Sequence, residues 1–153
     1  MMPTASKVIA QLAGKTLVTA ESLTGGGIGA ALTAVPGASA VFKGGIISYT
    51  DAVKREVLGV PAAYLSSFGA VSAPVAEAMA LGAFNLMQAD YAISVTGLAG
   101  PAGDDYGNPV GTVFIGFCSK TTGFSKEYHF SGDRGSIRNQ TIEAALQLVL
   151  ENL

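Results

Sequence analysis

Helix-like and strand-like segments alternate along most of this 153-residue chain, and two strand-like segments then follow each other directly. Apolar strand-like runs at 15–20, 44–49 and 91–96 are separated by segments in which apolar residues recur with helical spacing. Such alternation is typical of parallel strands joined by helical crossovers, whereas two adjacent strands predict an antiparallel hairpin. The pattern predicts an α/β fold with three layers, α/β/α, around a mixed, mainly parallel sheet with an antiparallel hairpin edge.

The remaining elements follow from glycine and proline punctuation and from apolar spacing. A short helix through Lys54 to residue 58 would be capped by Thr50 or Asp51. Turn residues are so dense between 97 and 109 that a long loop is expected there. The other expected helices cover 5–12, 28–35, 61–67, 74–88 and 133–153, and the hairpin strands cover 111–119 and 124–130. With no repeat, linker or low-complexity segment, one domain is expected over 1–153.

The composition excludes several classes of protein. Hydrophobic residues make up 49% and charged residues 13% of the chain, which is the opposite of a disordered composition. No apolar run is long enough to span a membrane, and a net charge of −2 gives no electrostatic drive toward nucleic acid. The single cysteine, Cys118, cannot form an internal disulfide or a zinc site built from several thiolates.

The scarcity of charge also predicts an apolar or neutral surface. We expect a homo-oligomer to cover that surface, although the few charges could simply be thinly spread. The first residues do not combine a basic region with an apolar stretch, so no signal peptide is expected. The expected location is therefore cytoplasmic.

The first candidate site is the segment 21–26, Glu-Ser-Leu-Thr-Gly-Gly, between an expected strand and an expected helix. Ligands of open α/β sheets bind beyond the carboxyl ends of strands, where helix starts offer free N–H groups. This loop could cradle a phosphate or form an oxyanion hole, with Ser22 placed as a nucleophile. The alternative is that Ser22 and Thr24 cap the helix while Gly25 and Gly26 make a turn.

A serine nucleophile needs a base to activate its hydroxyl. The only histidine, His129, falls in an alternating hairpin strand, where a surface or packing role is expected, and this argues against a Ser-His-Asp triad. Lys54 follows the strand that ends at Tyr49, at the same edge of the sheet as Ser22, and burial could make it a base. Tyr49 could relay the proton. The alternatives are a solvated helix lysine and a packing tyrosine.

A second small-residue loop, with Thr96, Gly97, Ala99 and Gly100, follows the third strand. Three strand ends would thus converge on one rim, and the long glycine-rich continuation could close over a ligand. The alternative is a flexible connection, although long unstructured loops are uncommon in compact domains unless they are functional.

Two arginines near the start of the last helix form a further candidate site. Arg134 and Arg138 lie four residues apart and so share one helical face. Paired arginines recognise phosphate or carboxylate groups through their fork geometry. A surface salt-bridge face is the alternative.

Several of these segments together resemble the CinA C-terminal domain family in order and spacing, from about residue 6 to residue 153. They are the segments 21–26, 44–49, Lys54 with 58–60, 69–72, 96–101 and 109–113. Members of this family are described as competence/damage-inducible proteins. Many are nicotinamide-nucleotide amidohydrolases, which convert nicotinamide mononucleotide to nicotinic acid mononucleotide and ammonia in pyridine-nucleotide recycling.

The resemblance implies an amidohydrolase that uses Ser22 as nucleophile, Tyr49 as its tyrosine and Lys54 as general base. Amides of the turn Thr24, Gly25 and Gly26 would stabilise the oxyanion, while backbone amides and Arg138 would hold the phosphate. The other expected substrate-binding residues are Ser48, Thr96, Gly97, Ala99 and Gly100. The expected partner is a small-molecule nucleotide, with no metal, cofactor, nucleic acid or membrane involved.

The chain departs from the family pattern at a few positions. Leu23 stands where cysteine is common, and Ala102, Asp104 and Asp105 interrupt what is often a longer glycine run. Many members carry an extra N-terminal domain. No counterpart of that domain is expected in this sequence, which is therefore expected to be a stand-alone form. The alternatives to an enzyme are a non-catalytic nucleotide-binding or regulatory module and a structural partner of the competence or damage-response machinery.

Overall fold

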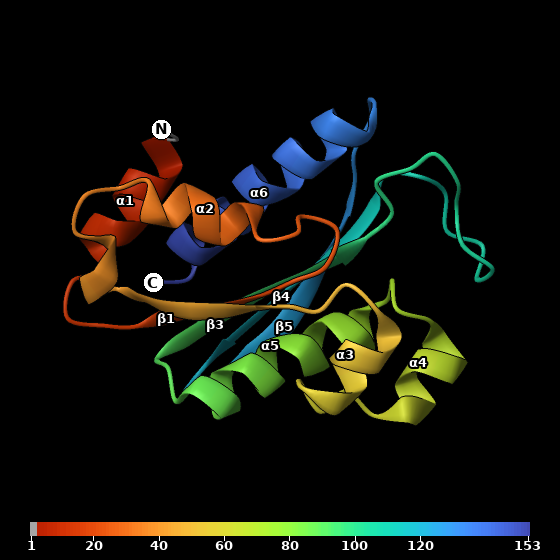
Figure 1. Cartoon of the computed structure of the whole chain (residues 1–153), viewed down its shortest axis with the longest axis horizontal. Helices are drawn as coiled ribbons and strands as arrows, with labels where there is room; N and C mark the ends of the chain where they lie inside the picture. The colour runs from red at the N-terminus through yellow and green to blue at the C-terminus, as the bar shows by residue number, and fades with distance from the viewer. Residues whose placement is uncertain (1–2) are drawn as a thin grey trace.

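The computed structural model describes residues 3–153, so the first two residues of the expected domain 1–153 lie outside the described part. Five strands form one sheet in the order β2-β1-β3-β4-β5 (Figure 1). β1 pairs in parallel with β2 and β3, whereas the pairs β3–β4 and β4–β5 are antiparallel. The predicted mixed sheet with a hairpin edge is therefore confirmed. The strands are β1 (Leu17–Glu21), β2 (Phe42–Ile47), β3 (Tyr91–Gly97), β4 (Thr112–Ser119) and β5 (Gly123–His129).

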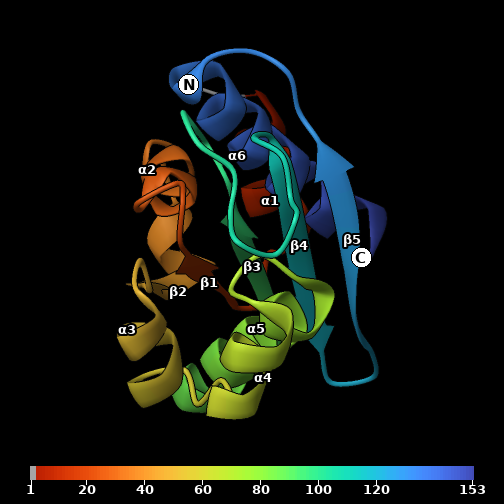
Figure 2. The same ribbon diagram turned by 90° about the vertical axis from the view of Figure 1, so that its right-hand side faces the viewer.

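Helices lie on both sides of the sheet, as Figures 1 and 2 show, so the three-layer prediction is also confirmed. One side carries α1 (Pro3–Gln11), α2 (Gly27–Thr33) and α6 (Arg134–Glu151). The other side carries α3 (Asp51–Glu56), α4 (Ala62–Phe68) and α5 (Ala73–Met87), and a 3₁₀ turn, η1 (Ala38–Ala40), precedes β2. No helix described between residues 3 and 153 has the length and apolar character that crossing a membrane requires.

Successive residues of the central strands enter two different cores. Leu17 and Ile93 pack among the side chains of α1, α2 and α6, whereas Val18 and Ala92 pack under α5. β1 is buried along its whole length, as expected for a central strand covered on both faces. Burial of apolar surface on both faces holds the sheet edge in place for the residues that follow its strands.

The connections place the ends of β1, β2 and β3 side by side. The chain leaves β1 through α2 to reach β2, then passes through α3, α4 and α5 to reach β3 on the other side of β1. At its carboxyl end, Glu21 pairs with Ile47 of β2 and with Val95 of β3. The direction of the strand order thus changes at β1, which is where open α/β sheets bind their ligands.

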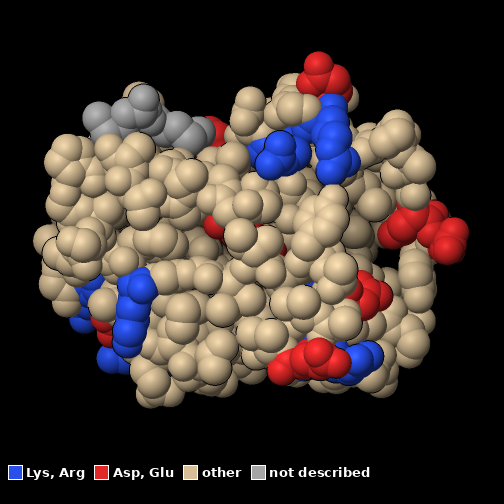
Figure 3. Space-filling view, in the orientation of Figure 1, with Lys and Arg blue, Asp and Glu red and all other residues tan. Residues whose placement is uncertain are grey.

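Charged side chains are sparse on the face that Figure 3 shows, in keeping with the composition. Several large apolar side chains are exposed at the surface, among them Tyr64, Phe68, Leu81 and Leu86. Their presence is consistent with an apolar surface, and the homo-oligomer stays a prediction.

Helix α5 approaches its neighbours closely at two glycines. A Cβ atom on Gly82 of α5 would lie 1.9 Å from the carbonyl oxygen of Leu58. A Cβ atom on Gly116 of β4 would lie 2.4 Å from the carbonyl oxygen of Ala76 in α5. Both clashes are with backbone atoms, so only a shift of the helix or of its neighbours could relieve them.

We therefore expect Gly82→Ala to lower the free energy of unfolding by about 1–3 kcal/mol, the usual cost of overpacking. This is opposite to the effect of helix propensity, which favours alanine over glycine. Gly135→Ala in α6 is the matched control, because the nearest atom to its new Cβ would be 3.7 Å away. Urea denaturation of both variants is the measurement, and a Gly82→Ala protein as stable as the Gly135→Ala protein would contradict the prediction.

Candidate active site

The site is built around a serine and a lysine that face each other at the sheet edge. Ser22 directly follows β1, and its amide donates to the carbonyl of Val95 at 3.1 Å, which fixes the end of the strand. Lys54 reaches in from α3, and its Nζ lies 3.0 Å from Ser22 Oγ and 2.7 Å from the carbonyl oxygen of Ser48. Ser22 is 7% exposed and Lys54 is 1% exposed. The sequence-predicted nucleophile and base are thus within hydrogen-bond distance.

Burial changes the acid–base behaviour of Lys54. Removing the charged amine from water lowers its pKa from 10.5 to about 8, and the nearby carboxylate of Asp51 partly opposes this shift. A lysine with a pKa near 8 has a significant neutral fraction at ordinary pH, and the neutral amine can accept a proton. Lys54 therefore has both the position and the basicity that a general base for Ser22 needs.

Glu21 holds the loop that carries Ser22. Its carboxylate is 2% exposed and accepts hydrogen bonds from the amides of Ile28 at 2.8 Å and Gly29 at 3.0 Å. It also accepts from Thr24 Oγ1 at 2.6 Å. A carboxylate in this place satisfies free N–H groups at the start of α2 and complements the helix dipole. This role was missed from the sequence, although an acidic residue shortly before a helix start was the available signal.

The loop amides differ from the expected oxyanion hole at one position. The amide of Gly25 donates to the carbonyl of Ser22 at 3.1 Å, so it is not free to bind an oxyanion. Within residues 3–153, the amides of Leu23, Thr24 and Gly26 donate to no other group. Gly25 and Gly26 have φ values of +58° and +101°, which glycine adopts without strain. Three amides of the turn are therefore free to act as oxyanion donors.

The two arginines serve different parts of the site. Arg138 donates from Nε to the carbonyl of Leu23 at 2.9 Å and from Nη2 to that of Thr24 at 3.2 Å, so it braces the serine loop from behind. Arg134 donates to the carbonyl of Gly100 at 2.6 Å and to the hydroxyl of Tyr49 at 3.1 Å. The arginine that lines the cavity is therefore Arg134, whereas Arg138 was the one expected to hold a phosphate.

Tyr49 lies at the rim of the site. Its side chain is 57% exposed, and its hydroxyl accepts from Arg134. No hydrogen bond joins Tyr49 to Ser22 or Lys54 among the described residues, so the structure does not bring the tyrosine into a proton relay. Tyr49 instead helps to orient the guanidinium of Arg134.

The second predicted loop forms the opposite wall. Thr96 Oγ1 donates to the carbonyl of Ala70 at 2.8 Å, which ties the end of β3 to the segment before α5. Gly97, Ala99 and Gly100 border the cavity. A Cβ atom on Gly97 would lie 2.6 Å from the side chain of Val113, so the backbone approaches β4 too closely for a larger residue.

These elements enclose a cavity of about 270 Å³. Its lining includes Ser22, Tyr49, Asp51, Lys54 and Arg134, with small residues from the 96–102 segment completing the wall. Within residues 3–153, no group of three or more His, Cys, Asp and Glu side chains is placed to hold a metal ion.

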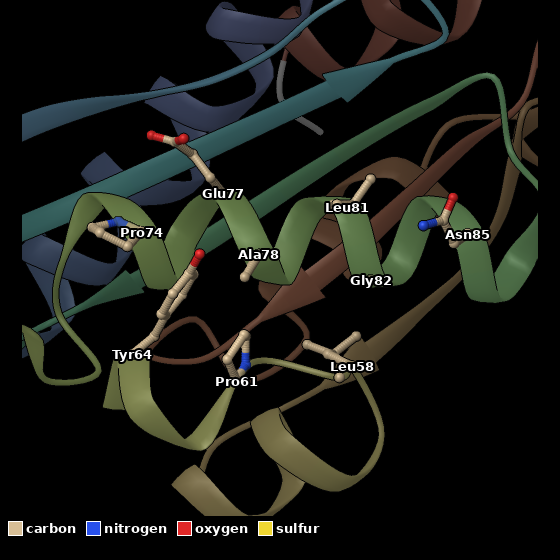
Figure 4. Close-up of a pocket in the computed structure, with 10 residues that line it drawn as sticks. Leu58, Pro61, Tyr64, Pro74, Glu77, Ala78, Leu81, Gly82 and Asn85 are labelled. Atoms are coloured by element: carbon tan, nitrogen blue, oxygen red, sulfur yellow. The ribbon is translucent and has the colours of Figure 1, made fainter. Parts of the chain in front are cut away.

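A second, larger cavity of about 580 Å³ lies on the outer side of α5, facing the segment from Leu58 to Tyr64 (Figure 4). Glu77 is the only charged residue among those that line it. No nucleophile paired with a base lies among the residues that line this cavity, so the candidate active site is the cavity at the sheet edge.

A sequence model of the family described as CinA C-terminal domain matches residues 2–153. This chain belongs to the CinA C-terminal domain family. The competence/damage inducible protein CihA from Agrobacterium tumefaciens has the same fold, with a TM-score of 0.93 and 38% identity. The similarity covers 97% of this chain and 92% of that one.

Two relatives of this CinA-family chain are similar in sequence over different shares of their length. A protein named nicotinamide-nucleotide amidohydrolase PncC from Pseudomonas putida is 45% identical over 88% of this chain and 84% of its own length. A CinA-like protein of Synechococcus sp. (strain CC9311) is 61% identical over 67% of this chain. The chain spans only 24% to 36% of several relatives named CinA-like protein.

Because Lys54 has a lower pKa in the folded chain than the usual 10.5, the unfolded chain binds more protons between about pH 8 and 10.5. The contribution of Lys54 to the free energy of unfolding therefore increases as the pH rises through this window. The free energy of unfolding of the unmodified protein, relative to that of Lys54→Met, should increase by about 2 kcal/mol between roughly pH 7.5 and 10. Urea denaturation at both pH values measures this gain.

Lys7→Met is the matched control, because Lys7 is exposed on α1. Its free energy of unfolding should follow that of the unmodified protein across the same pH range. If the difference in free energy of unfolding between the unmodified protein and Lys54→Met stays constant across this pH range, the pKa of Lys54 is not lowered by folding.

Proposed function

We propose that this protein is an amidohydrolase that converts nicotinamide mononucleotide to nicotinic acid mononucleotide and ammonia. The observation that carries the proposal is the 3.0 Å contact between Ser22 Oγ and the buried, weakly basic amine of Lys54. The relative named nicotinamide-nucleotide amidohydrolase, which this chain matches over most of both lengths, supports the choice of substrate.

In the first half of the proposed reaction, the neutral amine of Lys54 takes the proton of the Ser22 hydroxyl. Ser22 Oγ attacks the carboxamide carbon, and the carbonyl oxygen becomes an oxyanion. Free amides of the turn after Ser22 are the donors for that oxyanion, and loss of one such donor typically costs 10²–10³ in rate. The C–N bond then breaks, and Lys54 returns its proton to the departing nitrogen, which leaves as ammonia.

In the second half, a water molecule attacks the acyl group on Ser22. Lys54, again neutral, takes a proton from this water, and the same loop amides stabilise the second oxyanion. The ester bond to Ser22 breaks as Lys54 returns the proton to Oγ. Nicotinic acid mononucleotide is released and the enzyme is restored. One lysine thus acts as base and acid in both halves.

Arg134 is the group we assign to the substrate phosphate. It lines the cavity, and its partners Gly100 and Tyr49 are neutral, so its positive charge is not cancelled by a carboxylate. Guanidinium groups bind phosphate through paired N–H donors. Arg138 keeps the serine loop in place from the other side, so its removal would act on the geometry of Ser22.

The burial of Lys54 favours an enzyme over a non-catalytic binding module. Withdrawal of a lysine from water is costly, and the hydrogen bonds to Ser22 and Ser48 and the nearby carboxylate of Asp51 offset that cost only in part. A protein that only bound a nucleotide would gain nothing from a weakly basic amine against a serine hydroxyl. A general base requires such an arrangement.

Incubation of the protein with nicotinamide mononucleotide should release ammonia and nicotinic acid mononucleotide in equal amounts. Ser22→Ala and Lys54→Met should each lower kcat by at least about a thousandfold, because they remove the nucleophile or its base. Ser66→Ala and Lys7→Met are the matched controls, since both residues are exposed and neither lines the cavity.

Substantial activity in Ser22→Ala would exclude Ser22 as the nucleophile. Binding of the nucleotide to the unmodified protein without any ammonia would instead support the non-catalytic module. Circular dichroism of each variant checks that the fold is retained.

The pH dependence of the reaction should follow the protonation of Lys54. Since the neutral amine is the active form, kcat/KM should rise with pH and level off above about pH 8. Initial rates measured between about pH 6 and 10 give this profile. A profile that is flat through this range would contradict the assignment of Lys54 as the base.

A further inference from the structure

Asp51 is a charged residue of the active-site cavity that the proposed reaction does not use. It is the first residue of α3 and lines the same cavity as Ser22 and Lys54. Its side chain is exposed, and within residues 3–153 it takes part in no hydrogen bond or ion pair. The carboxylate is therefore available to a molecule that enters the cavity.

The charge of Asp51 works against the lysine base. It raises the pKa of Lys54, whereas burial lowers it. A carboxylate that favours the inactive, protonated form of a base is a disadvantage unless a bound substrate offsets its charge. The cavity is therefore best suited to a substrate that carries a positive charge next to Asp51.

Among the charged groups around the cavity, Asp51 is the one suited to pair with a positive group of a substrate. Arg134, which also lines the cavity, is positive and suits an anion. Asp104 lies in an adjoining cavity that shares Asp51, but its carboxylate already accepts from the amides of Tyr106 and Asn108 and from Asn108 Nδ2. Asp105 lines that adjoining cavity and adds a negative charge near Asp51.

We propose that Asp51 selects substrates whose carboxamide is carried by a cationic, N-substituted pyridinium ring, over amides of the same shape with an uncharged ring. The inference rests on the proposed function, in which the substrate is a pyridinium nucleotide. Such a molecule has a positive ring and a negative phosphate, which match the two charged groups Asp51 and Arg134 of the cavity lining. Two opposite charges in the lining also favour one orientation of the bound nucleotide.

The pairing has a consequence for the base. A pyridinium ring next to Asp51 cancels the charge that holds protons on Lys54, so the pKa of Lys54 falls further when substrate binds. Binding of the cationic ring thus increases the fraction of neutral amine at the moment when Ser22 must be activated. An uncharged ring would leave the base as it is in the free enzyme.

The test compares nicotinamide mononucleotide with its 1,4-dihydro form, which has the same ribose, phosphate and carboxamide but an uncharged ring. Both are titrated calorimetrically into Ser22→Ala and into Ser22→Ala with Asp51→Asn, so that no turnover occurs. Asp51→Asn should weaken binding of the cationic form about fivefold, the upper end of the range for one exposed ion pair. Binding of the dihydro form should not change.

Glu56→Gln in the Ser22→Ala background is the matched control, because it removes one negative charge from the same helix outside the cavity. It should leave the affinities for both ligands unchanged. Equal weakening of the two ligands by Asp51→Asn, or the same effect from Glu56→Gln, would overturn the proposal.

A second measurement uses the active enzyme. The pKa in the pH profile of kcat, which reports the substrate complex, should lie below the pKa in the profile of kcat/KM, which reports the free enzyme. Asp51→Asn should lower the pKa in kcat/KM and so bring these two pKa values closer together. Identical profiles for the two proteins would also overturn the proposal. Failure of the proposed function itself is seen separately, as an absence of ammonia from nicotinamide mononucleotide with the unmodified protein.

Discussion

The buried amine of Lys54 connects three parts of the chain that are distant in sequence. From α3 it reaches the hydroxyl of Ser22 after β1 and the carbonyl of Ser48 after β2. A buried ammonium without partners would cost several kcal/mol, so the amine holds its place only while both strand ends keep theirs. The lowered pKa of Lys54 and its closeness to Ser22 have this common origin. The chemistry therefore depends on the accuracy with which the sheet edge is formed.

A second buried ionisable residue, Glu21, precedes Ser22, but it does not interfere with the base. Its carboxylate is occupied by the amides of Ile28 and Gly29 and by the hydroxyl of Thr24. A carboxylate that was free to pair with Lys54 would hold the amine in its charged form. Because α2 takes up the negative charge of Glu21, the nucleophile can lie between a buried acid and a buried base that have separate partners.

The order of elements and the edge of the sheet that carries the site could be predicted, because they follow from local patterns and from the way parallel strands are connected. The closeness of Ser22 and Lys54 could be predicted as well, because both residues follow strands that end at this edge. The hydrogen-bond partners of individual side chains and amides could not be predicted. Arg134 and Arg138 are one turn apart and equivalent in sequence, and only the path of α6 decides which one lines the cavity.

The differences between the expected and the observed contacts of Gly25 and Tyr49 have the same cause. The amide of Gly25 turns back to Ser22, and the hydroxyl of Tyr49 meets Arg134, at distances of 3.1 Å in both cases. No residue pattern encodes the atomic distances that decide between these contacts and the expected ones. The glycine-rich loops likewise indicated a ligand site, while Gly82 and Gly116 turned out to permit close packing of α5.

The base is carried by a helix of only six residues, α3. Helices this short have little stability of their own and depend on tertiary contacts, here chiefly those of Lys54 itself. If α3 opens while the sheet stays folded, Lys54 becomes an ordinary solvated lysine that is protonated at neutral pH. Opening thus removes the base by displacing it and by restoring its charge. We therefore expect the proposed activity to be lost on heating when α3 opens, below the temperature at which the whole domain unfolds.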